Sequence, residues 1–227
     1  MSLFCLVHGA CQSASSWDLL IPELEVRGHK AIALNLPLED PNAGATRYAE
    51  AVLQALQGTN DDVVLVGHSM SGLFIPIVAN EHPIQKLVYL AAGIPQVGTS
   101  VIERLSQGNE SDMFNPACLE KDPSQDEGVA MELFFHDCKP EVARWGISKL
   151  RAQASTLIWS EISPLKALAD VECAYIVCTD DRTFTPAWSK RAAHELLGVE
   201  AIALPGGHCP QISRPVHLAE VLTSVVK

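Results

Sequence analysis

No stretch of the 227-residue chain approaches about 18 unbroken apolar residues, the length that a membrane-spanning helix needs. The first residues lack the basic segment and the long apolar core of a secretory signal. Basic residues are also few. The chain has 16 lysines and arginines against 27 acidic residues, which gives a formal net charge of −11. We therefore expect no membrane and no nucleic acid as partners, since anionic surfaces repel an acidic protein.

Paired cysteine spacing is absent as well. The seven cysteines are an odd number, form no CxxC pair and lie in no Cys/His cluster with zinc spacing. Neither GxGxxG nor GxxxxGK with a following Ser or Thr comes after an apolar run, which argues against dinucleotide and P-loop enzymes. From these absences we expect reduced thiols, a cytoplasmic location and no zinc site.

What the chain does contain is an alternation of short apolar runs and helical patterns. The apolar runs are continuous, as in strands buried on both faces, and several helical patterns end at a glycine. This alternation predicts an α/β fold, a mostly parallel sheet with helices on both faces. The expected strands are 3–7, 31–35, 63–66, 87–91, 174–178 and 200–204, and the expected helices are 15–28, 46–58, 71–82, 185–198 and 217–227.

The alternation stops in the middle of the chain. The stretch from about 94 to 165 has no strand pattern and carries several short helical patterns, and the strand pattern resumes at 174. An insertion between two strands of one sheet is expected to form a cap on the same domain. We predict a single domain, 1–227, with a core of about 1–93 and 166–227 and a helical cap of about 94–165.

A serine follows the third expected strand, in the sequence GHSMSG. Ser69 lies between that strand and a helix, which is the setting of a nucleophile elbow. Such a tight turn forces the serine to positive φ and requires small residues two positions before and after it. Gly67 and Ser71 both qualify, although Ser71 departs from the usual G-x-S-x-G pattern. The alternative is a serine that only caps the following helix.

A nucleophilic serine needs a base, and the base needs an acid that orients it. His208 lies in a glycine-rich loop after the last expected strand, at the edge of a parallel sheet where Ser69 would also lie. His136 in the cap is the other histidine that we keep as a candidate. Asp180 and Asp181 follow the fifth expected strand, and the residues alone leave both open. The chain order Ser, Asp, His is that of an α/β-hydrolase.

The first expected strand ends in His8-Gly9. A loop at this place would direct the Ala10 N–H toward the nucleophile, and the Met70 N–H would be the second donor of an oxyanion hole. The alternative is a plain strand-to-helix loop in which Ser15 or Ser16 caps the next helix.

The chain resembles the α/β-hydrolases, and within them the branch of plant salicylate-binding methylesterases and hydroxynitrile lyases with their bacterial relatives. The resemblance covers nearly the whole chain and rests on LVHGACQSASSWDLLIPELEVRGHKAIALNLP, GHSMSG, MELFFHDCKPEVARWGISKLRAQ and AYIVCTDDRTFTPAW. In the last segment that branch places its acid five residues before the proline. Because this proline is Pro186, the resemblance favours Asp181 over Asp180.

The resemblance also bears on the reaction. The lyases of this branch carry threonine after the first-strand histidine and lysine after the catalytic histidine, where this chain has Gly9 and Cys209. We therefore expect an esterase-type serine hydrolase that uses Ser69, Asp181 and His208 and needs no metal or cofactor. Hydroxynitrile lyase, other C–C or lactone chemistry, and a non-catalytic small-molecule binding protein stay open as alternatives.

Apolar side chains of the cap are the candidates for a substrate pocket, with packing inside the cap as the alternative. Such a lining favours small to medium apolar esters, so the expected partner is a small-molecule ester. A homodimer is kept as one alternative for the oligomeric state. The candidate side chains are Met113, Phe114, Met131, Phe134, Phe135, Trp145 and Trp159.

Overall fold

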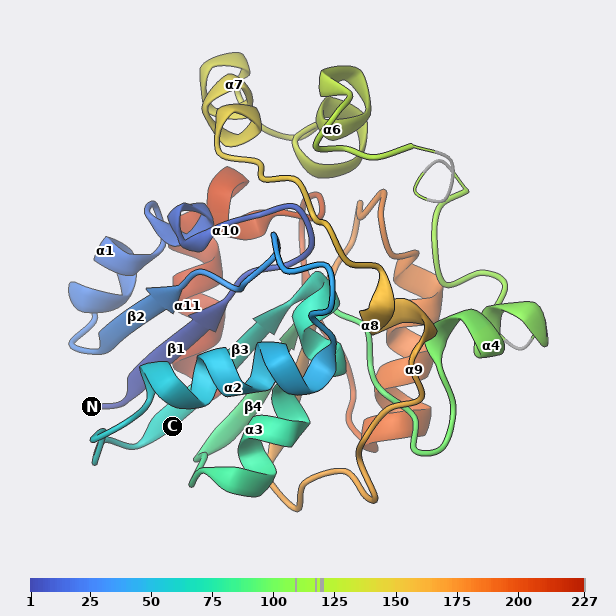
Figure 1. The fold of residues 1–227 in the computed structure, drawn as a ribbon. Coiled ribbons are helices and arrows are strands. Elements are labelled where there is room, and N and C mark those ends of the chain that lie inside the picture. The colour runs from blue at the N-terminus through green and yellow to red at the C-terminus, as the bar shows by residue number, and fades with distance from the viewer. Residues whose placement is uncertain (109, 117, 119–120, 227) are drawn as a thin grey trace.

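Six parallel strands form one sheet at the centre of the computed structural model, which describes residues 1–108, 110–116, 118 and 121–226. The order across the sheet is β2-β1-β3-β4-β5-β6, and all six expected strands are present (Figure 1). The strands are β1 Leu3–Val7, β2 Lys30–Leu34, β3 Val63–His68, β4 Lys86–Leu90, β5 Cys173–Cys178 and β6 Ile202–Leu204. The predicted α/β fold with a parallel sheet is confirmed.

The strand order reverses direction between β1 and β3. The chain runs from β1 outward to β2 and then returns to pair β3 on the other side of β1, so β1 and β3 are neighbours. In open parallel sheets, ligands bind outside the carboxyl ends of the strands at such a reversal. The loops that follow β1 and β3 are those expected to carry the oxyanion donors and the nucleophile.

Helices cover both faces of the sheet because successive strand side chains point to opposite sides. Phe4 and Leu6 of β1 belong to the apolar cluster that also holds residues of α1 (Ile21–Glu25) and α11 (Pro215–Ser224). Cys5 and Val7 belong to the opposite cluster. That second cluster holds residues of α2 (Ala45–Ala55), α3 (Ile75–Glu81) and α9 (Pro186–Leu197).

Two of the expected helices are each divided in the structure. The pattern at 15–28 becomes the 3₁₀ turn η1 (Ala14–Trp17) followed by α1, and the pattern at 71–82 becomes η2 (Ser69–Leu73) followed by α3. Both α-helices carry a proline in their first turn, at Pro22 and Pro76. Proline lacks the N–H that a continuous helix needs, so it can open a helix but not extend one that has already begun.

Between β4 and β5 the described residues form helices and no strand of the sheet. We use "cap segment" for residues 94–165, of which α6 and α7 lie side by side above α10 (Pro210–Ser213) at one end of the molecule (Figure 1). The helices of the cap segment are α4 Val101–Ser106, α6 Glu127–Phe134, α7 Pro140–Ser148 and α8 Leu157–Ser160. In the part of the chain that the structure describes, no helix has the length and apolar character needed to cross a membrane.

Candidate active site

Ser69 stands at the end of β3 with a φ of 55° and opens the 3₁₀ turn η2. A non-glycine residue in this region is uncommon and points to a constraint that the surrounding structure enforces. Gly67, two residues earlier, has no room for a side chain, because an added Cβ would lie 2.9 Å from Ile75 Cδ1 and 3.2 Å from Gly72 N. The turn therefore has the tight geometry of an elbow that holds a serine at the strand end.

Ser71, the departure from the glycine pattern, is fully buried and uses its hydroxyl. The Ser71 hydroxyl donates a hydrogen bond to the backbone oxygen of His8, which belongs to the loop after β1. The position that tolerates no side chain is the next one, because a Cβ on Gly72 would overlap the backbone oxygen of Gly93. A serine thus fits two residues after Ser69 and ties the elbow to the neighbouring loop.

His208 and Asp181 form a buried pair at the same edge of the sheet. His208 Nδ1 lies 2.9 Å from Asp181 Oδ2, and the two side chains are 0% and 1% exposed. The other carboxylate oxygen, Asp181 Oδ1, accepts the N–H groups of Thr183 at 2.7 Å and Phe184 at 3.1 Å. Asp180, by contrast, has a side chain that is 64% exposed and does not contact His208. Of the two adjacent acids, Asp181 is the one that contacts the imidazole.

The pairing leaves the second ring nitrogen of His208 available. Because Nδ1–H donates to the carboxylate, Nε2 carries the lone pair of the neutral ring. His208 Nε2 is buried, and no described residue donates to it or accepts from it. The Ser69 hydroxyl is not hydrogen-bonded to it in this structure. Hydrogen bonds between nucleophile and base are often long before substrate binds. The geometry is therefore compatible with a role of His208 Nε2 in accepting the Ser69 hydroxyl proton once substrate is bound.

The sequence patterns did not identify two rings that lie beside His208. The ring of Phe184 lies 6.0 Å from the imidazole, and the ring of His68 lies 4.7 Å from it. His68 Nε2 donates to the backbone oxygen of His208 at 2.8 Å. Burial, together with the neighbouring His208, holds the pKa of His68 well below its usual range, so His68 is a neutral donor. The only sequence signals were their places, Phe184 beside the acid and His68 directly before Ser69.

The loop after β1 is packed directly against Ser69. A Cβ on Gly9 would lie 2.7 Å from Ser69 Cβ, so only glycine allows this approach. His8 holds the loop, because its Nδ1 donates to Gly9 O at 2.8 Å and its Nε2 accepts the Leu36 N–H at 3.0 Å. Burial lowers the pKa of His8 to about 4, which keeps the ring neutral in this role.

The two expected oxyanion donors lie on either side of this contact. Ala10 follows Gly9, and its N–H forms no hydrogen bond within the described residues. Met70 is the second residue of η2, and N–H groups in the first turn of a helix have no acceptor in that helix. Both amides therefore belong to backbone that borders Ser69 and have hydrogen-bonding capacity to offer. Their role in stabilising an oxyanion stays a prediction.

The candidate pocket residues lie at different distances from His208. Phe134 is buried with its ring 5.6 Å from the His208 ring, and Phe114 reaches the same region through Phe184, whose ring is 4.8 Å away. Trp159 packs edge-on against Phe114 at 5.8 Å. Met113, Phe135 and Trp145 pack in apolar clusters, and Met131 is 36% exposed. Phe134 is the candidate in direct contact with the base, and the substrate-binding role of all of them stays a prediction.

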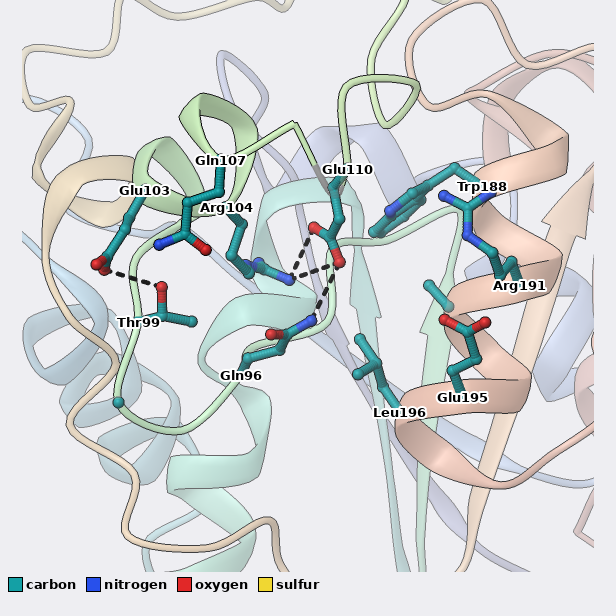
Figure 2. Close-up of a pocket in the computed structure, with 12 residues that line it drawn as sticks. Gln96, Thr99, Glu103, Arg104, Gln107, Glu110, Trp188, Arg191, Glu195 and Leu196 are labelled. Atoms are coloured by element: carbon teal, nitrogen blue, oxygen red, sulfur yellow. Dashed lines mark hydrogen bonds and ion pairs between the residues drawn. The ribbon is translucent and has the colours of Figure 1, made fainter.

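A cavity of about 420 Å³ lies elsewhere, between α4 and α9. Its lining includes none of Ser69, Asp181 and His208. Figure 2 shows Arg104 and Gln96 directed at the carboxylate of Glu110 on one side, with residues of α9 on the other. Arg104 Nη1 lies 3.0 Å from Glu110 Oε2, and both side chains are buried. Arg104 and Glu110 are thus paired within the lining, whereas Arg191 pairs with Asp112 outside it.

A metal site is not apparent in the ranges that the structure covers. No three His, Cys, Asp or Glu side chains among the described residues are placed to hold a metal ion together.

Comparisons with known proteins identify the family of this chain. The model of a family described as "Alpha/beta hydrolase family" matches residues 6–221. Salicylic acid-binding protein 2 from Nicotiana tabacum is 26% identical over 98% of this chain and 96% of its own. Methylesterase 2 from Arabidopsis thaliana is 27% identical over 98% of this chain and 95% of its own. The resemblance to this branch, expected from the sequence, is confirmed.

A solved structure shows the same fold. The crystal structure of polyneuridine aldehyde esterase superposes with a TM-score of 0.85 at 22% identity and covers 100% of both chains. At this identity the superposition establishes the fold alone. Several of the sequence relatives are named as esterases or methylesterases, which supports ester hydrolysis in general terms.

Proposed function

The chain belongs to the alpha/beta hydrolase family, and from this premise we propose that it hydrolyses carboxylic esters of small to medium apolar substrates. Ser69 is the nucleophile, His208 the general base and acid, and Asp181 the group that orients His208. One observation carries this proposal above the others. His208 Nδ1 is held at 2.9 Å by a buried carboxylate, while its Nε2 is buried and has no partner among the described residues. Buried polar atoms without a partner are few in folded proteins, and a role as general base accounts for this one.

The reaction begins when Ser69 Oγ attacks the ester carbonyl carbon and His208 Nε2 takes the hydroxyl proton. The carbonyl oxygen becomes an oxyanion, which the Ala10 and Met70 N–H groups stabilise. The C–O bond to the alcohol then breaks, and His208 gives its proton to the leaving oxygen. Water attacks the acyl-enzyme with His208 again as base, which releases the carboxylic acid and restores Ser69. Asp181 stays ionised throughout and stabilises the imidazolium form of His208.

The surroundings of the base favour an apolar substrate. The rings of Phe134 and Phe184 lie 5.6 Å and 6.0 Å from the His208 ring, so a substrate group at Nε2 meets aromatic surface. Apolar walls with few polar groups are typical of sites for small organic ligands. The methylesterase names of the relatives fit a small alkyl or aryl ester, and on this basis we propose that substrate class.

A hydrolase is favoured over a lyase by the residue after the base. The lyases of this branch place a lysine there, and this chain has Cys209. Cys209 is fully buried and its thiol accepts a hydrogen bond from Gln12 Nε2 at 3.2 Å. Burial raises the pKa of the Cys209 thiol well above its usual range, so it is uncharged. An uncharged thiol supplies no cation for a leaving cyanide.

Hydrolysis of p-nitrophenyl esters from acetate to octanoate tests this proposal with the wild type and Ser69→Ala. The wild type is expected to cleave the shorter esters, and the variant to lose on the order of 10⁴-fold or more in kcat. Ser100→Ala is the matched control, because Ser100 is also buried but caps α4 away from the base. It should keep wild-type turnover. Rapid turnover by Ser69→Ala would overturn the assignment.

A further inference from the structure

The turn between α6 and α7 touches both loops that carry the base and the acid. This turn contains His136 and Asp137, which lie in the cap segment. Each of the two residues makes a hydrogen bond to the backbone of a residue that directly precedes a proposed catalytic one. They contact Asp180, which precedes Asp181, and Gly207, which precedes His208.

Asp137 holds the loop of the base. Its Oδ2 accepts the N–H of Gly207 at 2.9 Å, and the carboxylate side chain is only 8% exposed. Arg214 Nε lies 3.6 Å from the same oxygen, which offsets the cost of a buried negative charge. The other oxygen, Oδ1, is buried without a partner among the described residues. The carboxylate therefore acts chiefly through one hydrogen bond to the backbone beside His208.

His136 holds the loop of the acid. Its Nε2 lies 3.0 Å from the backbone oxygen of Asp180, and since a carbonyl only accepts, His136 must carry a proton on Nε2. The Asp180 N–H in turn donates to Gly206 O at 2.9 Å. The hydrogen bonds thus form a closed circuit: from the cap to the acid loop, from the acid loop to the base loop, and from the base loop back to the cap.

The two glycines before His208 let the cap approach this closely. A Cβ on Gly207 would lie 2.7 Å from His136 Nε2 and 2.8 Å from Asp137 Oδ1. Gly206 has a φ of +125°, and a Cβ there would lie 2.8 Å from Asp137 Oδ2. No side chain separates the cap from the backbone of the base loop, so a shift of the cap turn is transmitted directly to His208.

We propose that His136 and Asp137 are positioning residues that set the separation of Asp181 and His208 from the cap side. This inference rests on the proposed esterase function and extends it. The cap segment then has a part in aligning the acid and the base in addition to any part in covering the substrate. A displacement of about 1 Å at a reacting group can cost about 10²-fold in rate, so a single hydrogen bond at Gly207 is enough to affect turnover.

The experiment compares Asp137→Ala with Asp137→Asn in steady-state hydrolysis of a p-nitrophenyl ester. Asp137→Ala is expected to lower kcat by about 10- to 100-fold with KM changed by less than about three-fold, because alignment and not substrate binding is lost. Asp137→Asn should recover most of kcat, since the amide oxygen can still accept the Gly207 N–H. Asp137→Asn also loses the ion pair with Arg214, but it removes at the same time the buried negative charge that this pair offsets.

Asp126→Ala is the matched control in the same cap. Asp126 accepts the Val129 N–H at 3.1 Å and caps α6, so its loss weakens the cap without touching either catalytic loop. It should lower thermal stability and leave kcat within about two-fold of the wild type. Equal losses of kcat in Asp126→Ala and Asp137→Ala would indicate general loosening of the cap and overturn the proposal. So would a kcat of Asp137→Ala that equals that of the wild type.

Failure of the esterase function itself is recognised separately. If the wild type neither cleaves the esters nor reacts with a serine-directed organophosphate, the proposed function fails. If the wild type does both and Asp137→Asn is as slow as Asp137→Ala, the hydrogen bond to Gly207 does not position the base. If the negative charge of Asp137 served only the stability of the cap, Asp137→Asn would not recover kcat. Recovery of kcat by asparagine therefore supports the positioning role.

Discussion

The edge of the sheet around Ser69 and the cavity between α4 and α9 differ in how their polar groups are arranged. At the sheet edge, Asp181 and the backbone fix His208 so that one nitrogen, Nε2, is buried and has no partner among the described residues. In the cavity, Arg104 and Gln96 bind the carboxylate of Glu110, so a buried ion pair stands where the sheet edge has a single basic nitrogen. The cavity has the volume, about 420 Å³, and the sheet edge holds the three residues of the proposed triad.

Under the proposed function, empty volume is a poor guide to chemistry in this molecule. Three features lie at the sheet edge, near the strand-order reversal between β1 and β3. They are Ser69 with its positive φ, the loop after β1 in which only glycine fits at position 9, and His208 oriented by Asp181. The cavity lies against the side of α9 and is lined by none of these groups.

Asp181→Asn should remove most of the activity at the sheet edge. An amide in place of the carboxylate can present N–H to His208 Nδ1 and stabilise the wrong tautomer, which typically costs about 10⁴-fold in kcat. Asp180→Asn is the control, because the Asp180 side chain is 64% exposed and its backbone hydrogen bonds are kept. Steady-state kinetics of both variants measures the difference. Similar losses in the two variants would contradict the assignment of the acid.

Gly9→Ala should lower kcat/KM by about 10²- to 10³-fold, the usual cost of a lost oxyanion donor. The added methyl group would lie 2.7 Å from Ser69 Cβ and must push the loop, with Ala10, away from the elbow. Gly58→Ala serves for comparison, since Gly58 has a φ of +74° but nothing within 4 Å of its added Cβ. That variant should lose only stability. Full activity in Gly9→Ala would show that the loop position is not needed.

Acid should unfold the protein partly through His8. Burial lowers the pKa of His8 from its ordinary 6.5 to about 4, so below pH 6.5 the unfolded chain binds more protons than the folded one. The free energy of unfolding should therefore fall as the pH is lowered from 6.5 to 4, with a His8 contribution of roughly 3 kcal/mol. His68 acts in the same direction.

Urea unfolding between pH 7.5 and pH 4 measures this slope. His8→Gln should flatten it. His194→Gln, which changes a histidine with a 70% exposed side chain beside Glu200, should leave it unchanged. A stability that rises as the pH falls through this window would show that His8 is not a buried neutral ring.

Ser71→Ala should destabilise the protein by about 1–2 kcal/mol, because it leaves the backbone oxygen of His8 without its buried donor. Ser106→Ala removes a similar hydroxyl-to-carbonyl hydrogen bond at an exposed site and should change stability by less than about 0.5 kcal/mol. Chemical denaturation compares the two. If Ser71→Ala is as stable as the wild type, the hydroxyl does not hold the elbow to the loop after β1.

Glu195→Gln should have the smallest effect on catalysis. Glu195 lines the cavity on the α9 side (Figure 2), and the lining includes none of the proposed catalytic residues. We expect kcat/KM to stay within about two-fold of the wild type. A loss of ten-fold or more for the same ester would mean that the cavity belongs to the reaction site, and the contrast drawn above would not hold.

The sheet and the order of the site residues could be predicted because both follow from local patterns. Continuous apolar runs located all six strands, and the rule that sites lie at the carboxyl ends of parallel strands placed Ser69 and His208 at one edge. The choice between Asp180 and Asp181 needed the family resemblance, since two adjacent acids in one loop have no pattern to separate them. The structure then places Asp181 against His208.

The cap could not be predicted at the same level, because its contacts join residues far apart in the chain. His136 meets Asp180 and Asp137 meets Gly207, across 44 and 70 positions. No periodicity encodes such pairs. Similarly, apolar residues at helical spacing do not reveal which of them face a substrate. Phe134 lies beside His208, whereas Phe135, the next residue, packs against Gly146 inside the cap.

The most direct test of the central claim is to identify the residue that a serine-directed organophosphate modifies. The wild type is incubated with a fluorophosphonate, digested and mapped by mass spectrometry, with Ser69→Ala in parallel. We expect a single adduct on Ser69, loss of ester hydrolysis in proportion to labelling, and no adduct in the variant. Ester hydrolysis that continues after labelling, or an adduct on another residue that abolishes activity, would contradict it.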